Sequence, residues 1–238
     1  MRPGPRTCST ALLGALALSA LALGGCGQGL PEAHTLVQRT AKAMAELKGY
    51  HLSGESEALG ITTAFQLVAL RNGDFSGALE IRVPGAKQFT SRVVATGSKV
   101  WVRSPQELAE LGITSLPGNL DPSTTWVLQP QAVGAGYRRS VRPFVGRGLG
   151  STLAQALRGR LTVSRGRRGH RPVLLVEERG GGSSLRMLVA PRNDRLLQLS
   201  IAGRARISLD YSGFGQVGSV APPPAAEVYV PPAQANPG

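Results

Sequence analysis

The chain has 238 residues, of which 42% are hydrophobic, and it carries a formal net charge of +13 at pH 7. This length and composition exclude a disordered chain and predict one sizeable globular domain or, as the weaker alternative, two small ones. So basic a chain could bind nucleic acid. The export signal described next argues against that partner, because an exported protein first meets anionic lipid head groups and acidic wall polymers.

Residues 1–25 have the composition of a signal peptide. Arg2 and Arg6 give a positive start, residues 11–23 are small and apolar, and two glycines follow as a cleavage site. A helix over 11–23 would be about 20 Å long, short of the roughly 30 Å hydrocarbon core of a bilayer, so a permanent transmembrane anchor is not expected. Removing the two arginines from the count of +13 leaves +11 for the remaining chain.

A cysteine follows this signal directly, at Cys26, where the sequence reads Leu-Gly-Gly-Cys. The arrangement resembles the lipobox of bacterial lipoproteins, which implies a diacylglycerol on the Cys26 sulfur. Two acyl chains hold a protein firmly on a membrane. Cleavage before Cys26 would remove Cys8 and exclude an internal disulfide. We expect an exported protein, anchored through Cys26 to the outer face of the cytoplasmic membrane or elsewhere in the cell envelope. The alternative is a plain secretory signal followed by an unmodified cysteine.

The first element expected after the signal is an amphipathic helix. Residues 26–30 form a short tether, and over 31–48 apolar side chains recur at three- and four-residue spacing until Gly49 ends the helix. From Tyr50 the apolar period changes to two, which is typical of strands with one dry and one wet side. Strands are predicted over Tyr50 onward, 61–69, 75–83, 89–95 and 99–103, with a tight turn at Asn72-Gly73.

The middle of the chain, roughly 104–150, is less regular. A short helix is predicted there at 105–111 and a strand at 125–128, followed by a stretch rich in Gly and Arg. A second helix is predicted at 151–157. Five further strands follow, at 161–164, 172–177, 184–189, 196–201 and 204–211. Residues 221–238 are rich in Pro and Ala and are expected to form an extended, partly disordered tail.

Together these elements predict an α+β domain over 31–220. Its ten or eleven strands form a single, strongly curved antiparallel sheet, a half-barrel whose concave side is covered by helices. Each strand shows one apolar face only, so the covered side is the dry one. Space between the sheet and the helices is where a ligand could be enclosed.

This order of elements resembles the half-barrel lipid-carrier lipoproteins, the group that includes the lipoprotein carrier LolA and the mycobacterial LppX and LprG type. The resemblance rests on the lipobox, the helix ending Ala-Glu-Leu-Lys-Gly-Tyr-His at 45–51, the hairpin at 97–102, the strand at Trp126-Val127 and the closing segment 207–215. It implies a hydrophobic cavity that accepts acyl chains of lipids or acylated lipoproteins. The high arginine content departs from the group and leaves the class of ligand open.

The function expected from these features is that of a lipid-anchored extracytoplasmic carrier that binds acyl chains without covalent chemistry. The alternative is a non-carrier lipoprotein of the same fold, with a filled core, whose partner is a membrane or envelope protein such as a transporter. Six dry-face positions are assigned to the cavity or core: Phe65, Leu67, Phe75, Leu79, Ile81 and Phe89. A patch for anionic head groups, with a solvated loop as the alternative, is assigned to Arg165, Arg167, Arg168 and Arg171.

No catalytic, metal or cofactor site is predicted. The three histidines, His34, His51 and His170, lack the spacing of metal ligands. The sequence has neither a nucleophile elbow nor a phosphate-binding loop, and the glycines of 146–150 lack the strand, turn and helix setting of a dinucleotide site. We therefore do not expect an enzyme.

Overall fold

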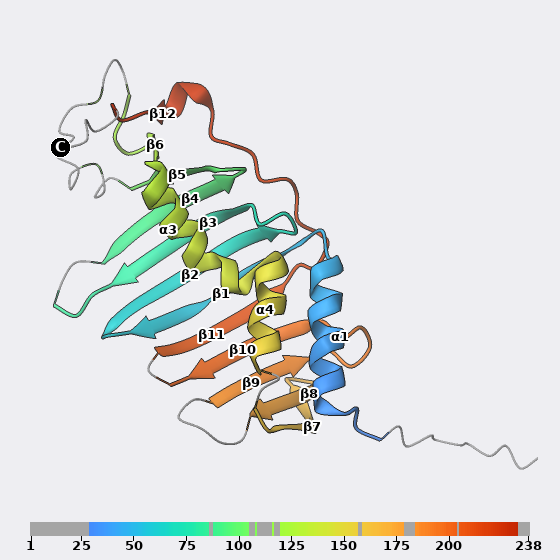
Figure 1. Cartoon of the computed structure of the whole chain (residues 1–238). Coiled ribbons are helices and arrows are strands. Elements are labelled where there is room, and N and C mark those ends of the chain that lie inside the picture. Colours follow the sequence, from blue (N-terminus) through green and yellow to red (C-terminus); the bar gives the residue numbers. More distant parts are fainter. Residues whose placement is uncertain are drawn as a thin grey trace, which may run out of the picture.

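A computed structural model describes residues 29–85, 88–104, 108, 116, 120–156, 159–178, 184–203 and 205–232 (Figure 1). The predicted signal peptide, Cys26 and, apart from Leu108, the predicted helix at 105–111 lie outside these residues. Within the described part, no helix combines the length and the apolar character that crossing a bilayer requires.

The domain is built on one open sheet of twelve strands in the order β12-β6-β5-β4-β3-β2-β1-β11-β10-β9-β8-β7. The predicted single antiparallel sheet is confirmed, because among the described strand pairs only β12 and β6 run parallel. The strands are β1 (Gly49–Ala58), β2 (Ile61–Leu70), β3 (Phe75–Arg82), β4 (Phe89–Thr96), β5 (Lys99–Arg103), β6 (Trp126–Leu128), β7 (Leu161–Arg168), β8 (Arg171–Glu178), β9 (Ser184–Val189), β10 (Leu196–Ala202), β11 (Ala205–Ser212) and β12 (Val228–Tyr229).

The predicted number of ten or eleven strands is too low, because the prediction did not include the strand β12. Val228 and Tyr229 pair with Trp126 and Val127 of β6, inside the segment that the sequence suggested was a tail. Figure 1 shows the chain running from β11 past the ends of several strands to reach this edge of the sheet. A strand of two residues in a proline-rich segment shows no alternation, so apolar periodicity does not reveal it.

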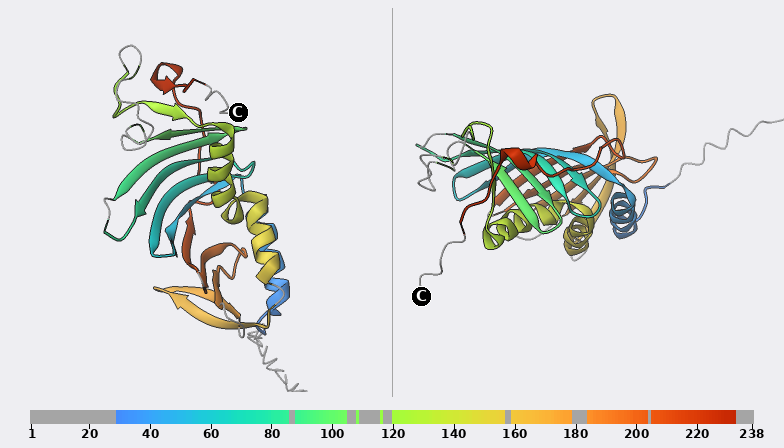
Figure 2. Two further views of the ribbon diagram at one scale, coloured as in Figure 1. Left: turned by 60° about the vertical axis from the view of Figure 1, so that its left-hand side comes forward. Right: turned by 90° about the horizontal axis from the view of Figure 1, so that it is seen from above.

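Within the described residues, three α-helices with defined bounds lie on one face of this sheet (Figure 2). They are α1 (Ala33–Glu46), α3 (Gln131–Val141) and α4 (Gly146–Ala156), and the 3-10 turn η1 (Arg142–Phe144) joins the last two. A second 3-10 turn, η2 (Ala225–Glu227), precedes β12. The helix expected at 31–48 corresponds to α1, and the helix expected at 151–157 is the second half of α4. The helix α3 was not predicted, because Gly134 and Gly136 lower the helix propensity of this segment.

The N-terminus of α1 is capped by Glu32. Its carboxylate accepts hydrogen bonds from the backbone N–H of His34 at 2.9 Å and of Thr35 at 2.6 Å. These hydrogen bonds, that of His34 first, lower the pKa of Glu32 to about 2. Since the pKa of a free glutamate is near 4.5, the contribution of the charged cap is complete above that pH and is lost as the pH falls towards 2.

The core lies between the helices and the face of the sheet that they cover, which we call the dry face. Leu36 of α1 and Leu153 of α4 are inaccessible to solvent, and so are Val93 of β4 and Leu209 of β11. Side chains from both halves of the sheet thus share one continuous core with the helices. Burial of such apolar surface is the main favourable contribution to folding.

The hydroxyl of Tyr50 connects the sheet to the helical layer. It donates to the carbonyl oxygen of Phe144 in η1 and accepts from the N–H of Gly146 at the start of α4, both at 3.1 Å. The neighbouring Tyr211, whose ring centroid is 5.5 Å away, has a buried hydroxyl without a hydrogen-bond partner in the described part of the chain. Burial raises the pKa of both tyrosines well above the usual value, so both hydroxyls stay neutral.

Two glycines allow strands to approach each other closely on the dry face. A Cβ atom on Gly54 of β1 would lie 2.0 Å from the carbonyl oxygen of Ser208 on β11. A Cβ atom on Gly77 of β3 would lie equally close, 2.0 Å, from the carbonyl oxygen of Gln66 on β2. Neither position accepts a side chain unless the neighbouring strand moves.

The opposite, outer face of the sheet carries a second and smaller apolar cluster. Val94, Trp101 and Trp126 are buried there, and Val220 and Val228 of the C-terminal segment pack against them. The guanidinium of Arg103 lies 4.9 Å from the centroid of the Trp126 ring, within the range of a cation–π contact. The C-terminal segment therefore shields the outer face where β4, β5 and β6 lie.

We expect Gly54→Ala to destabilise the fold by about 1–3 kcal/mol, because the added methyl group clashes with backbone on β11. Gly150→Ala in α4 is the matched control. A Cβ atom there meets nothing within 4 Å, so the same change should stabilise the helix by roughly 0.5–1 kcal/mol. Urea denaturation measures both values, and a shift of the same sign for the two variants would contradict the close approach.

We expect Tyr50→Phe to destabilise the protein by about 1–3 kcal/mol, since it leaves the Phe144 carbonyl and the Gly146 N–H without their partner. Tyr211→Phe removes a buried hydroxyl that has no partner in the described residues, so its free energy of unfolding should stay the same or rise. Thermal unfolding of the two variants compares them directly. Equal losses of stability would show that the Tyr50 hydroxyl does not connect the layers.

Candidate functional site

Two of the six apolar residues assigned from the sequence are part of the packed core. Leu67 and Phe75 are 3% and 1% exposed. The remaining four, Phe65, Leu79, Ile81 and Phe89, lie on the same dry face of β2, β3 and β4. They are nearer the opposite ends of these strands and are less buried. Helix cover therefore ends between these two groups.

The partly buried residues belong to a longer row, which we call the apolar strip: Phe65, Leu79, Ile81, Phe89, Ile201 and Ile207. Strand register places four members in one row, with Phe89 beside Ile81 and Ile207 beside Ile201 and with the polar Thr63 and Ser56 between these two pairs. Phe65 and Leu79 pair in the neighbouring row of the same face. Ile81 is the most exposed of the six, at 37%. Figure 1 shows the strands from β4 to β10 extending on the left beyond α3 and α4.

The arginines assigned to head groups lie on the hairpin of β7 and β8. Arg165 and Arg167 are exposed on β7, and Arg171 opens β8. Arg168 donates to the carbonyl oxygen of Leu197 on β10 at 3.1 Å and pairs with Asp210 of β11 at 2.7 Å. Figure 2 shows the hairpin projecting on the side away from the helices. Arg168 thus connects the β7–β8 hairpin to β10 and β11.

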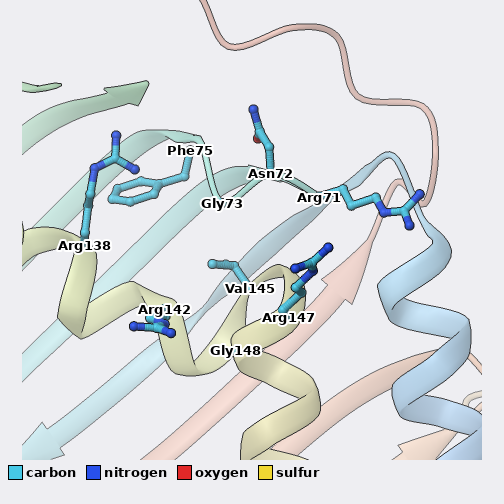
Figure 3. Close-up of a pocket in the computed structure, with 9 residues that line it drawn as sticks. All are labelled: Arg71, Asn72, Gly73, Phe75, Arg138, Arg142, Val145, Arg147 and Gly148. Atoms are coloured by element: carbon cyan, nitrogen blue, oxygen red, sulfur yellow. The ribbon is translucent and has the colours of Figure 1, made fainter. Parts of the chain in front are cut away.

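A cavity of about 680 Å³ opens between the turn that joins β2 to β3 and the helical segment from α3 to α4 (Figure 3). Its lining comes from three segments: the turn at 71–75, the end of α3 with η1 at 138–142, and the start of α4 at 145–148. Phe75 and Val145 supply its apolar part, and Phe75 is the one predicted site residue that lines it. Four of the lining residues are arginines, namely Arg71, Arg138, Arg142 and Arg147.

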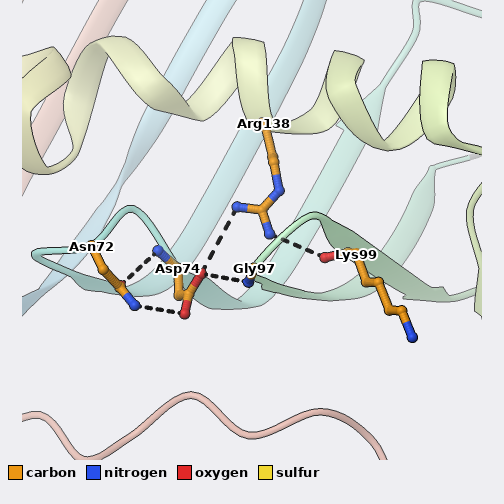
Figure 4. Close-up of polar contacts among 5 residues, drawn as sticks. All are labelled: Asn72, Asp74, Gly97, Lys99 and Arg138. Carbon is orange, nitrogen blue, oxygen red and sulfur yellow. Dashed lines mark hydrogen bonds and ion pairs between the residues drawn. The ribbon is translucent and has the colours of Figure 1, made fainter.

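Asp74 holds the turn beside this cavity in place (Figure 4). Its carboxylate accepts hydrogen bonds from the Gly97 N–H at 3.0 Å and from the side-chain amide of Asn72 at 2.8 Å. The Asn72 side-chain oxygen accepts the N–H of Asp74 at 3.0 Å. Two neighbouring turns of the sheet are therefore joined through one carboxylate.

Arg138 connects α3 to this pair of turns. Its guanidinium donates to the carbonyl oxygen of Lys99 at 3.1 Å and lies 4.0 Å from the Asp74 carboxylate. Asp74 thus partly compensates the charge of Arg138. In the described part of the chain, the other three cavity arginines form no ion pair.

Sequence reasoning did not assign any of the four cavity arginines. It recognised the turn at Asn72-Gly73 and the glycine run at 146–150, but their spacing of more than seventy residues gives no sign that they meet. The unpredicted helix α3 is what brings Arg138 and Arg142 to the same place. A signal that was available is Arg147 between two glycines, Gly146 and Gly148, at the start of a helix.

The three histidines lie apart in the structure. His34 contacts Glu32 at 2.8 Å at the start of α1, His51 is on β1, and His170 is in the turn between β7 and β8. Among the described residues, no group of three His, Cys, Asp or Glu side chains is arranged to hold a metal ion.

Comparison with protein-family models finds no match, and comparison with curated proteins finds none either. Solved structures with some similarity include MucB in complex with MucA(peri), at 12% identity and a TM-score of 0.35 over 81% of this chain and 58% of that chain. The Pseudomonas aeruginosa MucA/MucB complex has 14% identity and a TM-score of 0.36 over 82% of this chain and 60% of that chain. MucB alone has 12% identity and a TM-score of 0.33 over 83% of this chain and 62% of that chain. The chain therefore spans about three fifths of the length of these MucB structures.

Proposed function

We propose that this protein is a lipid-anchored, extracytoplasmic carrier that binds acyl chains of a lipid or an acylated lipoprotein, without covalent chemistry. The observation that carries the proposal is that the dry face is longer than its helix cover. The helices bury one part of that face, and the apolar strip continues it into contact with solvent. Covering exposed apolar surface of this kind with a hydrocarbon chain lowers the free energy, because both surfaces are removed from water.

The dimensions of the apolar strip favour an acyl chain. The strip crosses six strands, from β4 to β10 through β3, β2, β1 and β11, and at about 4.8 Å between strands it is roughly 24 Å long. One leaflet of a bilayer, half of the roughly 30 Å hydrocarbon core, is about 15 Å deep. A single extended acyl chain would therefore fit along the strip.

The area of the strip is small for a protein partner. Its six side chains each expose about a third of their surface or less, with Ile81 at 37% the most exposed. At roughly 200 Å² for a large apolar side chain, the exposed total is about 400 Å². A stable protein interface buries about 800 Å² on each partner. The strip alone is therefore better matched to a narrow ligand.

The predicted anchor would place this surface close to a membrane. Cys26 precedes the first residue of α1, Ala33, by seven positions. A fully extended segment of that length spans at most about 25 Å. A diacylglyceryl group on Cys26 would thus keep the domain within a short distance of the bilayer, where acylated ligands are found.

A second candidate function is that of a non-carrier lipoprotein that binds a membrane or envelope protein. It is favoured by the packing beneath the helices, where Leu36, Leu149 and Leu153 are inaccessible to solvent and contribute to a filled core. For the carrier function, the same packing means that acyl chains would lie on the apolar strip beside the helices, because the space beneath the helices is filled. The two candidates differ in whether the purified protein retains lipid.

Mass spectrometry of solvent extracts distinguishes the two candidates. The protein is purified as the Cys26→Ser variant, which cannot be lipidated and leaves bound lipid as the source of any acyl chain detected. A carrier is expected to yield acyl chains in a defined ratio to protein. An extract without lipid, together with no uptake of a fluorescent fatty acid, would support the second candidate.

We expect Phe89→Glu to weaken binding of a fluorescent fatty acid at least tenfold, because it places a charge in the strip beside Ile81. Thr90→Glu is the matched control, since Thr90 is the next residue on β4 and points to the outer face. Fluorescence titration of the two variants measures the difference. Equal affinity in both would remove the strip as the acyl-binding surface.

A further inference from the structure

The cavity beside the turn of β2 and β3 contains positive charge that the described residues compensate only at Arg138. Four arginines line the cavity and no lining residue is acidic. Asp74 lies near Arg138, at 4.0 Å, whereas Arg71, Arg142 and Arg147 form no ion pair with any described residue. A hollow with one sign of charge concentrates ions of the opposite sign.

Two glycines place these arginines beside one another. A Cβ atom on Gly146 would lie 2.9 Å from the carbonyl oxygen of Arg71, and one on Gly148 would lie 1.8 Å from that of Arg142. Gly146 also has a φ of +50°, a conformation that glycine adopts without strain. Arg147 lies between the two glycines, so the start of α4 is in close contact with the backbone of Arg71 and of Arg142. The backbone contacts thus bring residues with positive side chains from three segments to one part of the molecule.

The start of α4 adds to this demand for an anion. The first turn of α4 has no acidic side chain and contains Arg147 instead. A helix carries partial positive charge at its N-terminus, where an arginine is unfavourable and an anion is favourable. In addition, the Nε atom of Arg138 is buried and has no hydrogen-bond partner in the described part of the chain.

We propose that this cavity binds a ligand with two or more phosphate groups, held by Arg138, Arg142 and Arg147. Guanidinium groups match phosphate oxygens with pairs of parallel N–H donors. Figure 3 shows Arg138, Arg142 and Arg147 spread around Phe75 and Val145, while Arg71 points aside at the margin. Arginines spread around a hollow of about 680 Å³ suit several phosphates better than one.

This site is independent of the acyl-binding function. Phe75, in the cavity lining, and Ile81, in the apolar strip, are at opposite ends of β3. Six residues of strand separate them by about 20 Å. Phe89→Glu should therefore leave phosphate binding unchanged. Fatty-acid binding tests the apolar strip and phosphate binding tests the cavity, so one proposal can fail without the other.

The test uses inorganic tripolyphosphate and orthophosphate as probes, at constant ionic strength, with the Cys26→Ser chain. Calorimetric titration is expected to show tripolyphosphate binding at least tenfold more tightly than orthophosphate. The double variant Arg142→Gln/Arg147→Gln should weaken tripolyphosphate binding at least tenfold. Arg139→Gln is the matched control, because Arg139 is exposed on α3 and does not line the cavity.

Thermal unfolding without ligand keeps a loss of binding distinct from a loss of structure. The double variant should unfold at the same temperature as the parent or higher, since it removes repulsion between like charges. Tripolyphosphate should raise the unfolding temperature of the parent and of Arg139→Gln, and not that of the double variant. No binding of tripolyphosphate, equal affinity for orthophosphate, or an equal loss in Arg139→Gln would overturn the proposal.

Vesicles identify the source of the phosphate groups. Phosphatidylcholine vesicles with and without a phosphatidylinositol phosphate are sedimented with each variant. Binding that depends on the phosphorylated lipid, is lost in the double variant and is kept in Arg139→Gln assigns the cavity to a lipid head group. Vesicle binding that is absent, or the same in all variants, assigns it to a soluble phosphate ester, provided that the tripolyphosphate result holds.

Discussion

The constraint on which the rest of the structure depends is that the long strands turn most of their apolar side chains to the same face of the sheet. Side chains alternate along a strand, so a slip of one residue in any pair would move a whole apolar set to the wet side. The register of Leu52 with Leu67 and of Leu199 with Leu209 keeps these residues together in the core. Helices α3 and α4, at 11 residues each, are about 16 Å long and cover only part of so wide a face.

Arginine has two different roles in this strongly basic chain. Arg168 pairs with Asp210 and Arg39 of α1 pairs with Asp194 in the turn before β10, so each joins elements that are distant in sequence. Exposed ion pairs of this kind add little to stability but favour one relative placement of the elements. Arg142 and Arg147 have no such acidic partner among the described residues. Both are exposed, so their guanidinium groups are accessible to an anion from outside the chain.

The sequence was sufficient to predict every strand except β12, but not the cavity. Alternation of period two gives the dry face directly, as in Phe75, Leu79 and Ile81 of β3, and the tight turn at Asn72-Gly73 follows from backbone preferences. The helix α3 has a low helix propensity at its two glycines, and the cavity that it helps to form joins segments near residues 71, 138 and 147. Contacts between such distant segments depend on how the helices cross the sheet, and local patterns contain no information on that crossing.

The pairing of β1 with β11 affects how the chain can fold while it is being made. β1 at Gly49–Ala58 is among the first strands to be made, yet one of its two neighbours, Ala205–Ser212, is among the last. Hydrogen bonds along that side of β1 cannot form until nearly the whole polypeptide is available. Folds dominated by such long-range pairing acquire structure slowly. A nascent chain of this protein would thus expose an unpaired, aggregation-prone edge for most of its synthesis, a period in which a chaperone would be of most use.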